Sequence, residues 1–489
     1  MKQRPSPLSW LHLPFGGVAR NMILVGGGTA LGQGALVVAS PILTRLFDPE
    51  AFGLLSVYGA VLAVLVSVAS LRYDFAIPIA NDAAEAVHLF MISVVLAVVA
   101  SALLGIVVVG WGPDLAVFLG ATAFRAFLWV LPVGLMVLAI GQALASWAVF
   151  HRSFPALGRW RSVQGLAQAI CQVVLGLLRF GPLGLILGDL VGRLFGMQRL
   201  LRSLAVDVRG TQISAATLRG YAKARWGFAR VMTTASLLNA LTTQIPFLLI
   251  PAAFGLQSSG QYFLAYRMLV LPSSLVSSAF NQVFFGEASF RRSDPQELHD
   301  LAYNGAVSLL IFAVPSYLIV AVGGGALIEF AFGHEWQEAG AYAQIIAPSL
   351  ILWSVTHPIS SLLLIGRRER ESLAFTAAEL CIRTGALLLG VVAQSLVVGV
   401  ASLSIVSILL GVGSLWRFLR VASVHLTELI RPTARITALT LPSIVLVILV
   451  GLVVPAAVPL AMAVGWCFAF GLAVKVSPEL RGLLKDAND

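Results

Sequence analysis

The chain has 489 residues, of which 58% are hydrophobic and only 11% charged, and its formal net charge at pH 7 is +10. Because soluble domains carry roughly a quarter of charged residues, water cannot be the main solvent of this chain, and the composition indicates a polytopic membrane protein. The positive charge does not indicate nucleic-acid binding, since the basic residues lie mostly in short connectors and do not alternate with aromatic side chains on a soluble face.

Apolar runs of membrane-spanning length follow one another along the chain. A helix needs about 20 mostly apolar residues to cross the hydrocarbon core. We predict an all-α protein with about 14 such helices, and about 12 is the alternative because the connectors between the last four runs are very short. The runs cover residues 21–44, 53–71, 86–110, 126–149, 161–178, 182–201, 229–252, 262–285, 302–322, 342–365, 372–393, 396–416, 436–454 and 457–474.

The longest basic connector divides the chain into two comparable parts. In addition, the segment PILTRLFDPEAFGLLSVY has a weak echo in PFLLIPAAFGLQSSGQYFLAY, with Gly53 opposite Gly260. A repeat of this kind predicts two pseudo-symmetric helix bundles around a central cavity. The predicted parts are a tail over 1–20, a bundle over 21–201, a basic linker over 202–228, a second bundle over 229–416, additional helices over 417–474 and a tail over 475–489.

Basic residues are concentrated in the connectors on one side of the predicted membrane. The opposite side holds only Arg45, Arg125 and Arg179. By the positive-inside rule, both termini are therefore expected in the cytoplasm.

The longest predicted segment on the outer side covers residues 323–341. We expect it to lie at the membrane surface, with Phe332 and Trp336 at the interface between lipid and water. It is too short for a folded catalytic domain.

One arginine lies inside a predicted span. Arg267 falls about one and a half turns into the run 262–285. An arginine in hydrocarbon costs from about 3 to above 10 kcal/mol, so we expect this side chain to face a water-filled cavity or a partner group. Its planar fork of donors would suit a diphosphate, and snorkelling to the outer interface is the alternative.

Two further pairs of charges have the i, i+4 spacing that places both members on one helical face. They are Asp189 with Arg193, and Glu379 with Arg383. Such pairs neutralise each other and hold helices together; the alternative is that Asp189 or Glu379 is a protonatable carboxylate that couples transport to an ion gradient. His357 is a candidate proton relay or a hydrogen-bonded interior residue next to a proline kink.

The region over residues 20–90 resembles a known family. It reads T-R-L-F-D-P-E-A-F-G, then an apolar helix, then L-R-Y-D-F-A-I-P. These motifs are similar to the first two membrane helices of the bacterial polysaccharide-export flippases. Those Wzx-like oligosaccharide flippases belong to the multidrug/oligosaccharidyl-lipid/polysaccharide exporter superfamily.

The resemblance implies a function that periodicity cannot give. It implies translocation of an undecaprenyl-diphosphate-linked oligosaccharide from the cytoplasmic to the outer leaflet of the bacterial inner membrane by alternating access. The product would be a surface polysaccharide such as O-antigen, capsule or exopolysaccharide, and the partners would be membrane lipid, a polysaccharide polymerase and glycosyltransferases. The resemblance also implies that Arg267 lines the central cavity and that Arg72, with Arg45 at the other end of the same helix, meets the head group. For Arg72 the alternative is interfacial anchoring.

The sequence contains no GxxxxGK[ST] loop, no HExxH motif, no nucleophile elbow and no clustered metal ligands. We therefore expect no cofactor, no metal and no enzymatic activity. Two alternatives to a flippase are an ion-coupled multidrug antiporter, which should have a cavity dominated by acidic residues, and a membrane polymerase or ligase of lipid-linked sugars, which usually needs a long outer loop. A structural scaffold would not need a buried Arg267.

Overall fold

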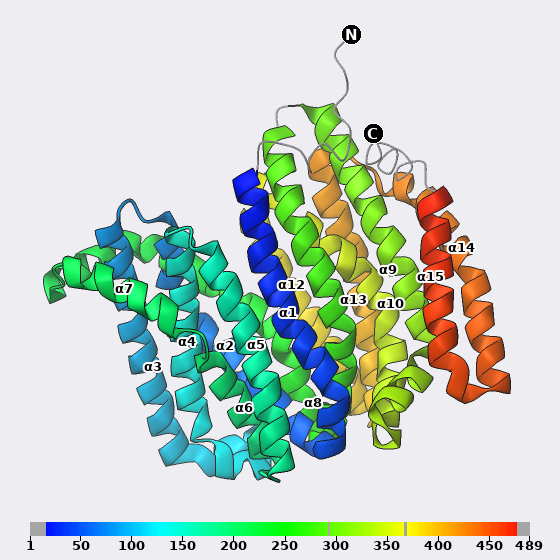
Figure 1. Cartoon of the computed structure of the whole chain (residues 1–489), viewed down its shortest axis with the longest axis horizontal. Helices are drawn as coiled ribbons and strands as arrows, with labels where there is room; N and C mark the ends of the chain where they lie inside the picture. The colour runs from blue at the N-terminus through cyan, green and yellow to red at the C-terminus, as the bar shows by residue number, and fades with distance from the viewer. Residues whose placement is uncertain (1–15, 292–293, 366–368, 477–489) are drawn as a thin grey trace. The chain divides into compact units, whose positions relative to one another are not determined.

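The computed structural model describes residues 16–291, 294–365 and 369–476, and within these ranges the regular structure is helical throughout (Figure 1). The predicted terminal tails lie almost entirely outside the described residues. Every predicted apolar run overlaps a helix, but the runs 182–201 and 342–365 each continue past the end of α6 or α10 into the next helix, α7 or α11 (Leu362–Ile365). The main helices that overlap these runs are α1 (Gly16–Leu46), α2 (Pro49–Ala69), α3 (Ala83–Phe118), α4 (Val130–Phe150), α5 (Phe154–Leu177), α6 (Pro182–Leu194), α8 (Ala215–Arg291), α9 (Pro295–Phe332), α10 (Gln337–Ile359), α12 (Glu369–Val392), α13 (Leu396–Leu419), α14 (Leu426–Val453) and α15 (Val458–Val476).

The described part of the chain contains ten helical segments that are long and apolar enough to cross a membrane. One of them, Ala215–Ser277 within α8, covers the predicted run 229–252 and most of the run 262–285. Between the two runs α8 is interrupted at Gly255, where φ is +85° and ψ is 169°. Glycine adopts this conformation without the clash that a Cβ atom would cause. The predicted class, an all-α polytopic membrane protein, is confirmed.

The described residues form two compact units. The first contains Leu24–Phe263 together with Leu373–Leu387, and the second contains Leu264–Ser372, the chain from Leu388 onward and the beginning of α1. In the second unit α10 packs against both α9 and α13. The two predicted bundles and their boundaries stay a prediction.

The basic segment predicted as a linker is itself helical. It contains most of α7 (Gln198–Gly210) and the first turns of α8. In Figure 1 α7 lies across α3 and α4, against which it packs, and Leu200 and Leu204 are buried there while Arg202 and Arg209 are exposed.

The prediction for residues 323–341 is wrong. Helix α9 continues to Phe332, the short 3-10 turn η4 (His334–Trp336) follows, and the Trp336 side chain is completely buried. The glycines in this segment serve close packing, since a Cβ on Gly323 would contact side chains of α14 and α15, and a Cβ on Gly340 would press on the backbone of Gly325. The physical cause of the error is that this glycine-rich sequence allows helices to approach each other.

Helix α2 is the central helix of the first unit. Asp48 caps its beginning by accepting a hydrogen bond from the Ala51 amide at 2.8 Å, and Pro49 at the first helical position has the φ angle that a helix needs. Among the membrane-spanning segments described, α2 is the most buried, with 67% of its most apolar window covered by protein. It is therefore a core helix and has little lipid-facing surface.

The beginning of α2 contacts the part of α8 that follows Gly255. A Cβ on Gly53 would overlap the carbonyl oxygen of Leu256, and a Cβ on Gly260 would overlap the carbonyl oxygen of Pro49. The hydroxyl of Ser56, about one turn after Gly53, is hydrogen-bonded to the hydroxyl of Ser259, which directly precedes Gly260, at 2.9 Å. The two glycines that the internal repeat aligns thus lie at one helix crossing.

We predict that Gly260→Ala destabilises the protein, because its methyl group would force apart two backbones that already touch. Overpacking of this kind costs roughly 1–3 kcal/mol. Gly59→Ala in α2 is the matched control, since a Cβ there meets nothing within 4 Å. Thermal unfolding of the purified protein in detergent should give a lower midpoint for Gly260→Ala and an unchanged or slightly higher midpoint for Gly59→Ala. Equal midpoints for the two variants would contradict the tight crossing.

Candidate functional site

The far end of α2 turns sharply back into the protein. After Ala69 the chain passes through Leu71 and Arg72, whose φ angles are +45° and +55°, and enters the 3-10 helix η2 (Tyr73–Ile79). Non-glycine residues rarely adopt this left-handed conformation, which costs on the order of 1–3 kcal/mol per residue. The turn directs the Arg72 side chain inward, where only 10% of it is exposed.

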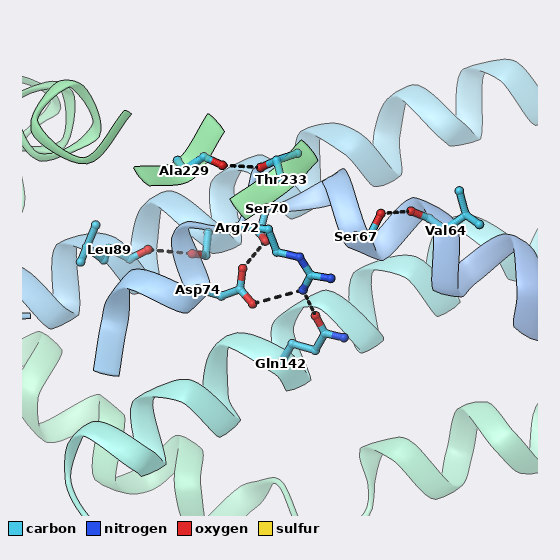
Figure 2. A network of polar contacts seen from close by, with 10 residues as sticks. Val64, Ser67, Ser70, Arg72, Asp74, Leu89, Gln142, Ala229 and Thr233 are labelled. Carbon is cyan, nitrogen blue, oxygen red and sulfur yellow. Dashed lines mark hydrogen bonds and ion pairs between the residues drawn. The ribbon is translucent and has the colours of Figure 1, made fainter. Parts of the chain in front are cut away.

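Arg72 is held by a small polar network, shown in Figure 2. Its Nη1 donates a hydrogen bond to Oε1 of Gln142 on α4 at 3.1 Å and lies 3.8 Å from Oδ2 of Asp74. The Ser70 hydroxyl donates to Oδ1 of Asp74 at 2.6 Å. The guanidinium also lies over the ring of Phe75, at 4.6 Å from its centroid. These contacts hold the guanidinium in place, and the Asp74 carboxylate compensates its charge.

Burial acts on both charges of this pair. Burial lowers the pKa of the Arg72 guanidinium, and the charge of Asp74 opposes that effect. Burial also raises the pKa of the Asp74 carboxyl, which the hydrogen bond from Ser70 and the charge of Arg72 oppose. Since each ion is expensive to bury alone, the two stabilise each other where they lie.

The first turns of α8 are tied to the same region. The Tyr73 hydroxyl donates to the carbonyl oxygen of Ala222 at 2.9 Å. Arg225 forms an ion pair with Glu85 at 2.7 Å, and Glu85 also accepts two hydrogen bonds from Asn81. Two contacts between residues far apart in sequence, one to a backbone carbonyl and one between side chains, therefore hold the first turns of α8 against η2 and α3.

A cavity of about 400 Å³ opens between α2, η2 and α8. Its size lies at the small end of the roughly 300–1,000 Å³ typical of ligand sites. Arg72 and Phe75 form one side, and Ala63 contributes from α2. The opposite wall is a face of α8 that consists of Ala235, Ser236, Asn239, Ala240, Thr243 and Gln244.

The wall on α8 is polar although the surrounding run is apolar. Ser236, Asn239 and Thr243 recur at helical spacing, and Gln244 follows on the same face. Asn239 and Thr243 are exposed. Polar side chains exposed in the middle of a membrane helix need water or a polar ligand, because hydrocarbon cannot satisfy their hydrogen bonds. The cavity is therefore expected to hold water.

Comparisons with known proteins agree with this architecture. The profile of a protein family described as "Polysaccharide biosynthesis protein" matches residues 42–341, which include α2, η2 and the wall on α8. The chain belongs to this family. The resemblance that the motifs at 44–53 and 71–78 carry is confirmed.

Two curated relatives are also named as biosynthesis proteins, one for lipopolysaccharide and one for amylovoran. The lipopolysaccharide biosynthesis protein WzxC of Escherichia coli (strain K12) is 26% identical over 374 residues, which are 72% of this chain and 71% of that protein. The amylovoran biosynthesis protein AmsL of Erwinia amylovora is 24% identical over 125 residues, 26% of this chain and 31% of that protein.

Solved structures share the fold. The lipid II flippase MurJ in an inward closed conformation superposes with a TM-score of 0.69 at 12% identity, covering 96% of this chain and 99% of that one. A multidrug resistance transporter of the MATE family, in an inward-facing conformation, has a TM-score of 0.60 at 14% identity over 83% of this chain and 98% of that one. This polysaccharide biosynthesis protein thus has the fold of polytopic helical transporters.

The predicted substrate-contacting arginines lie in different places. Arg72 lines the cavity. Arg45 is exposed at the end of α1, separated from Arg72 by the full length of α2, which is about 30 Å for its 21 residues. Arg267 is half-buried on the second part of α8 and belongs to the other compact unit.

Both predicted i, i+4 pairs form. Arg193 makes two hydrogen bonds to Asp189, at 2.7 and 3.0 Å, and Gln168 donates a third to the same carboxylate at 3.0 Å. Arg383 lies 2.7 Å from Glu379.

His357, the predicted relay candidate, is exposed on α10, and its ring packs beside Trp353 with the centroids 5.0 Å apart. A role in ion coupling stays a prediction for all three candidates, Asp189, Glu379 and His357.

Sequence reasoning missed the wall on α8. Its polar residues are scattered within the run 229–252, whose average hydropathy hides them, and each taken singly is unremarkable in a membrane helix. The available signal was their common face: positions 236, 239, 243 and 244 lie within one stripe of a 3.6-residue period. Gln142, the hydrogen-bond partner of Arg72, was missed for the same reason.

We predict that a cysteine on this wall reacts with water-soluble thiol reagents. In a background without the native cysteines, Asn239→Cys should be labelled rapidly by a charged methanethiosulfonate, because thiols ionise in water and not in lipid. Val99→Cys is the control, since Val99 on α3 is 49% exposed on an apolar face of a membrane-spanning helix. Slow labelling of Asn239→Cys, similar to that of Val99→Cys, would show that the cavity is not aqueous.

Proposed function

We propose that this protein translocates an undecaprenyl-diphosphate-linked oligosaccharide from the cytoplasmic to the outer leaflet of the bacterial inner membrane by alternating access. The observation that carries the proposal is the cavity beside Arg72, within a chain of the polysaccharide biosynthesis family that has the fold of transporters. Its lining includes one arginine and several neutral polar groups but no carboxylate. A polar head group fits such a lining, and a long lipid tail does not.

Each arginine has a role in this proposal. The lipid tail would remain in the bilayer while the head group passes through water. Arg267 would neutralise the diphosphate with its planar fork of donors. Arg72 would meet the head group at the cavity, and Arg45 would meet it at the opposite end of α2. We further propose that both termini face the cytoplasm, where glycosyltransferases supply the substrate, and that a polymerase receives it outside.

The cavity argues against drug antiport as the function. A site for organic cations needs acidic or abundant aromatic side chains, because a desolvated cation needs compensation. The residues that line this cavity include Phe75 as the single aromatic residue and no acid. The two carboxylates predicted as coupling candidates, Asp189 and Glu379, are each paired with an arginine. They would have to leave that arginine to bind a proton.

The polymerase or ligase alternative is also weakened. The predicted outer segment over 323–341 is mostly helical, and only Gly333 to Trp336 lies between α9 and α10. Helices α9 and α10 are packed together there, with Trp336 completely buried. This leaves little irregular chain at that point for the long loop that such enzymes usually need.

Depletion of the protein tests the proposal. Lipid-linked oligosaccharide should accumulate in the cytoplasmic leaflet of depleted cells, as measured by mass spectrometry with a probe of leaflet sidedness. Wild type should clear it, whereas Arg267→Ala and Arg72→Gln should clear it at least about tenfold more slowly, which corresponds to about 1.4 kcal/mol.

Arg125→Gln is the matched control, because it removes one exposed arginine outside the cavity. All variants are compared at equal amounts in the membrane. Unchanged lipid-linked sugars after depletion would refute the flippase proposal, and accumulation in the outer leaflet would indicate a polymerase or ligase.

A further inference from the structure

We propose that the face of α8 formed by Ser236, Asn239, Thr243 and Gln244 is a subsite for an uncharged sugar unit of the transported glycan. Arg72 and Phe75 form the facing side of this subsite. The inference rests on the proposed function and adds which part of the head group this cavity recognises.

The charge of Arg72 is already compensated. Its Nη1 contacts both Asp74 and Gln142, and its guanidinium lies over the ring of Phe75. A diphosphate at Arg72 would therefore compete with Asp74, whose carboxylate is 99% buried and cannot turn to water. The arginine thus offers a positioned hydrogen-bond donor and little net attraction for an anion.

The α8 wall offers donors and acceptors together. Each amide of Asn239 and Gln244 has a carbonyl oxygen and an NH₂ group, and the Ser236 hydroxyl can both donate and accept. The Thr243 hydroxyl donates to the carbonyl oxygen of Asn239 and can accept a hydrogen bond from a ligand. A phosphate group only accepts hydrogen bonds and would leave the two amide carbonyls without a donor, and an ammonium only donates them and would leave the two NH₂ groups without an acceptor. Sugar hydroxyls both donate and accept, and therefore match it.

The dimensions of the wall agree with a small carbohydrate. From position 236 to position 244 the helix rises about 12 Å at 1.5 Å per residue. Ala63 and Ala240 keep the space open between the polar groups. A cavity of about 400 Å³ of this length suits a mono- or disaccharide at the reducing end and not a complete glycan chain. The apolar ring of Phe75 supplies a surface against which the C–H face of a pyranose can pack.

Two substitutions of Asn239 that differ in hydrogen bonding and charge test the proposal. Asn239→Leu keeps the approximate size and removes the hydrogen bonds, whereas Asn239→Asp keeps the acceptors and adds a negative charge. In the depletion strain, with the lipid-linked oligosaccharide of that strain as the probe, Asn239→Leu should slow clearance at least about tenfold. Asn239→Asp should stay within about threefold of wild type, because a carboxylate accepts hydrogen bonds from sugar hydroxyls.

Two threonines on the same helix provide a matched pair. Thr243 lies on the wall and Thr234 on the opposite side of α8, and both hydroxyls donate to the carbonyl oxygen four residues earlier, at 3.0 Å. Thr243→Val should slow clearance, and Thr234→Val should not. Equal effects of the two valines would show a structural role of the hydroxyls and overturn the subsite.

A second readout separates recognition from damage to the fold. In cells that make two lipid-linked glycans with different first sugars, Asn239→Leu and Gln244→Met should change the ratio of their clearance rates. A purely structural defect would lower both rates equally and would overturn the inference.

The remaining outcomes are also decisive. Stronger inhibition by Asn239→Asp than by Asn239→Leu would place the diphosphate at this wall and refute an uncharged ligand. Wild-type clearance by every α8 variant would refute the subsite and leave the flippase function intact. Failure of the flippase function itself appears separately, as unchanged lipid-linked sugars in depleted cells that carry no variant.

Discussion

Close contact between two backbones, α2 with the second part of α8, is the constraint on which the first unit depends. At Gly53 and Gly260 no side-chain atom separates the helices, so neither can rotate without a clash. The hydrogen bond between Ser56 and Ser259 adds polar specificity next to that contact. With one end of α2 fixed in this way, the position of its other end follows, and that other end carries the turn into Arg72.

The Arg72 turn shows how a costly local conformation is maintained. Two consecutive non-glycine residues in the left-handed region are unfavourable, and a buried ion pair is rarely stabilising in itself. The surrounding contacts compensate for both. Ser70 and Gln142 hydrogen-bond the pair, and Tyr73 binds the backbone of α8. The unfavourable backbone conformation and the buried ion pair both lie at the edge of the cavity, and strained residues are commonly found at functional sites.

Sequence reasoning predicted the parts of this protein that repeat or follow a period. Long apolar runs predict the helices, i, i+4 spacing predicts both ion pairs, and the internal repeat aligns Gly53 with Gly260, which lie at one helix crossing. Arg72 was recognised through its position after the helix and its family motif.

Other features depend on neighbours that one sequence does not reveal. The segment around Gly323 reads as a polar surface loop, because its glycines and acidic residues are typical of loops, and yet its neighbours turn the glycines into packing contacts. Likewise, the polar residues of α8 form the wall of a cavity only because Arg72 and Phe75 lie across from them in the folded protein. The partners of the Arg72–Asp74 pair are another example, since Ser70 is local to Asp74 but Gln142 lies 70 residues away from Arg72.

Different stretches of α8 make different contacts, and this separation bears on which residues can be substituted. The residues that fix the helix to α2 follow Gly255, those that bind α3 and η2 come before position 226, and the polar wall lies between them. Substitutions on the wall therefore need not disturb either attachment. The polar lining of the cavity can therefore change by single substitutions on one helix face while both ends of that stretch of α8 stay attached.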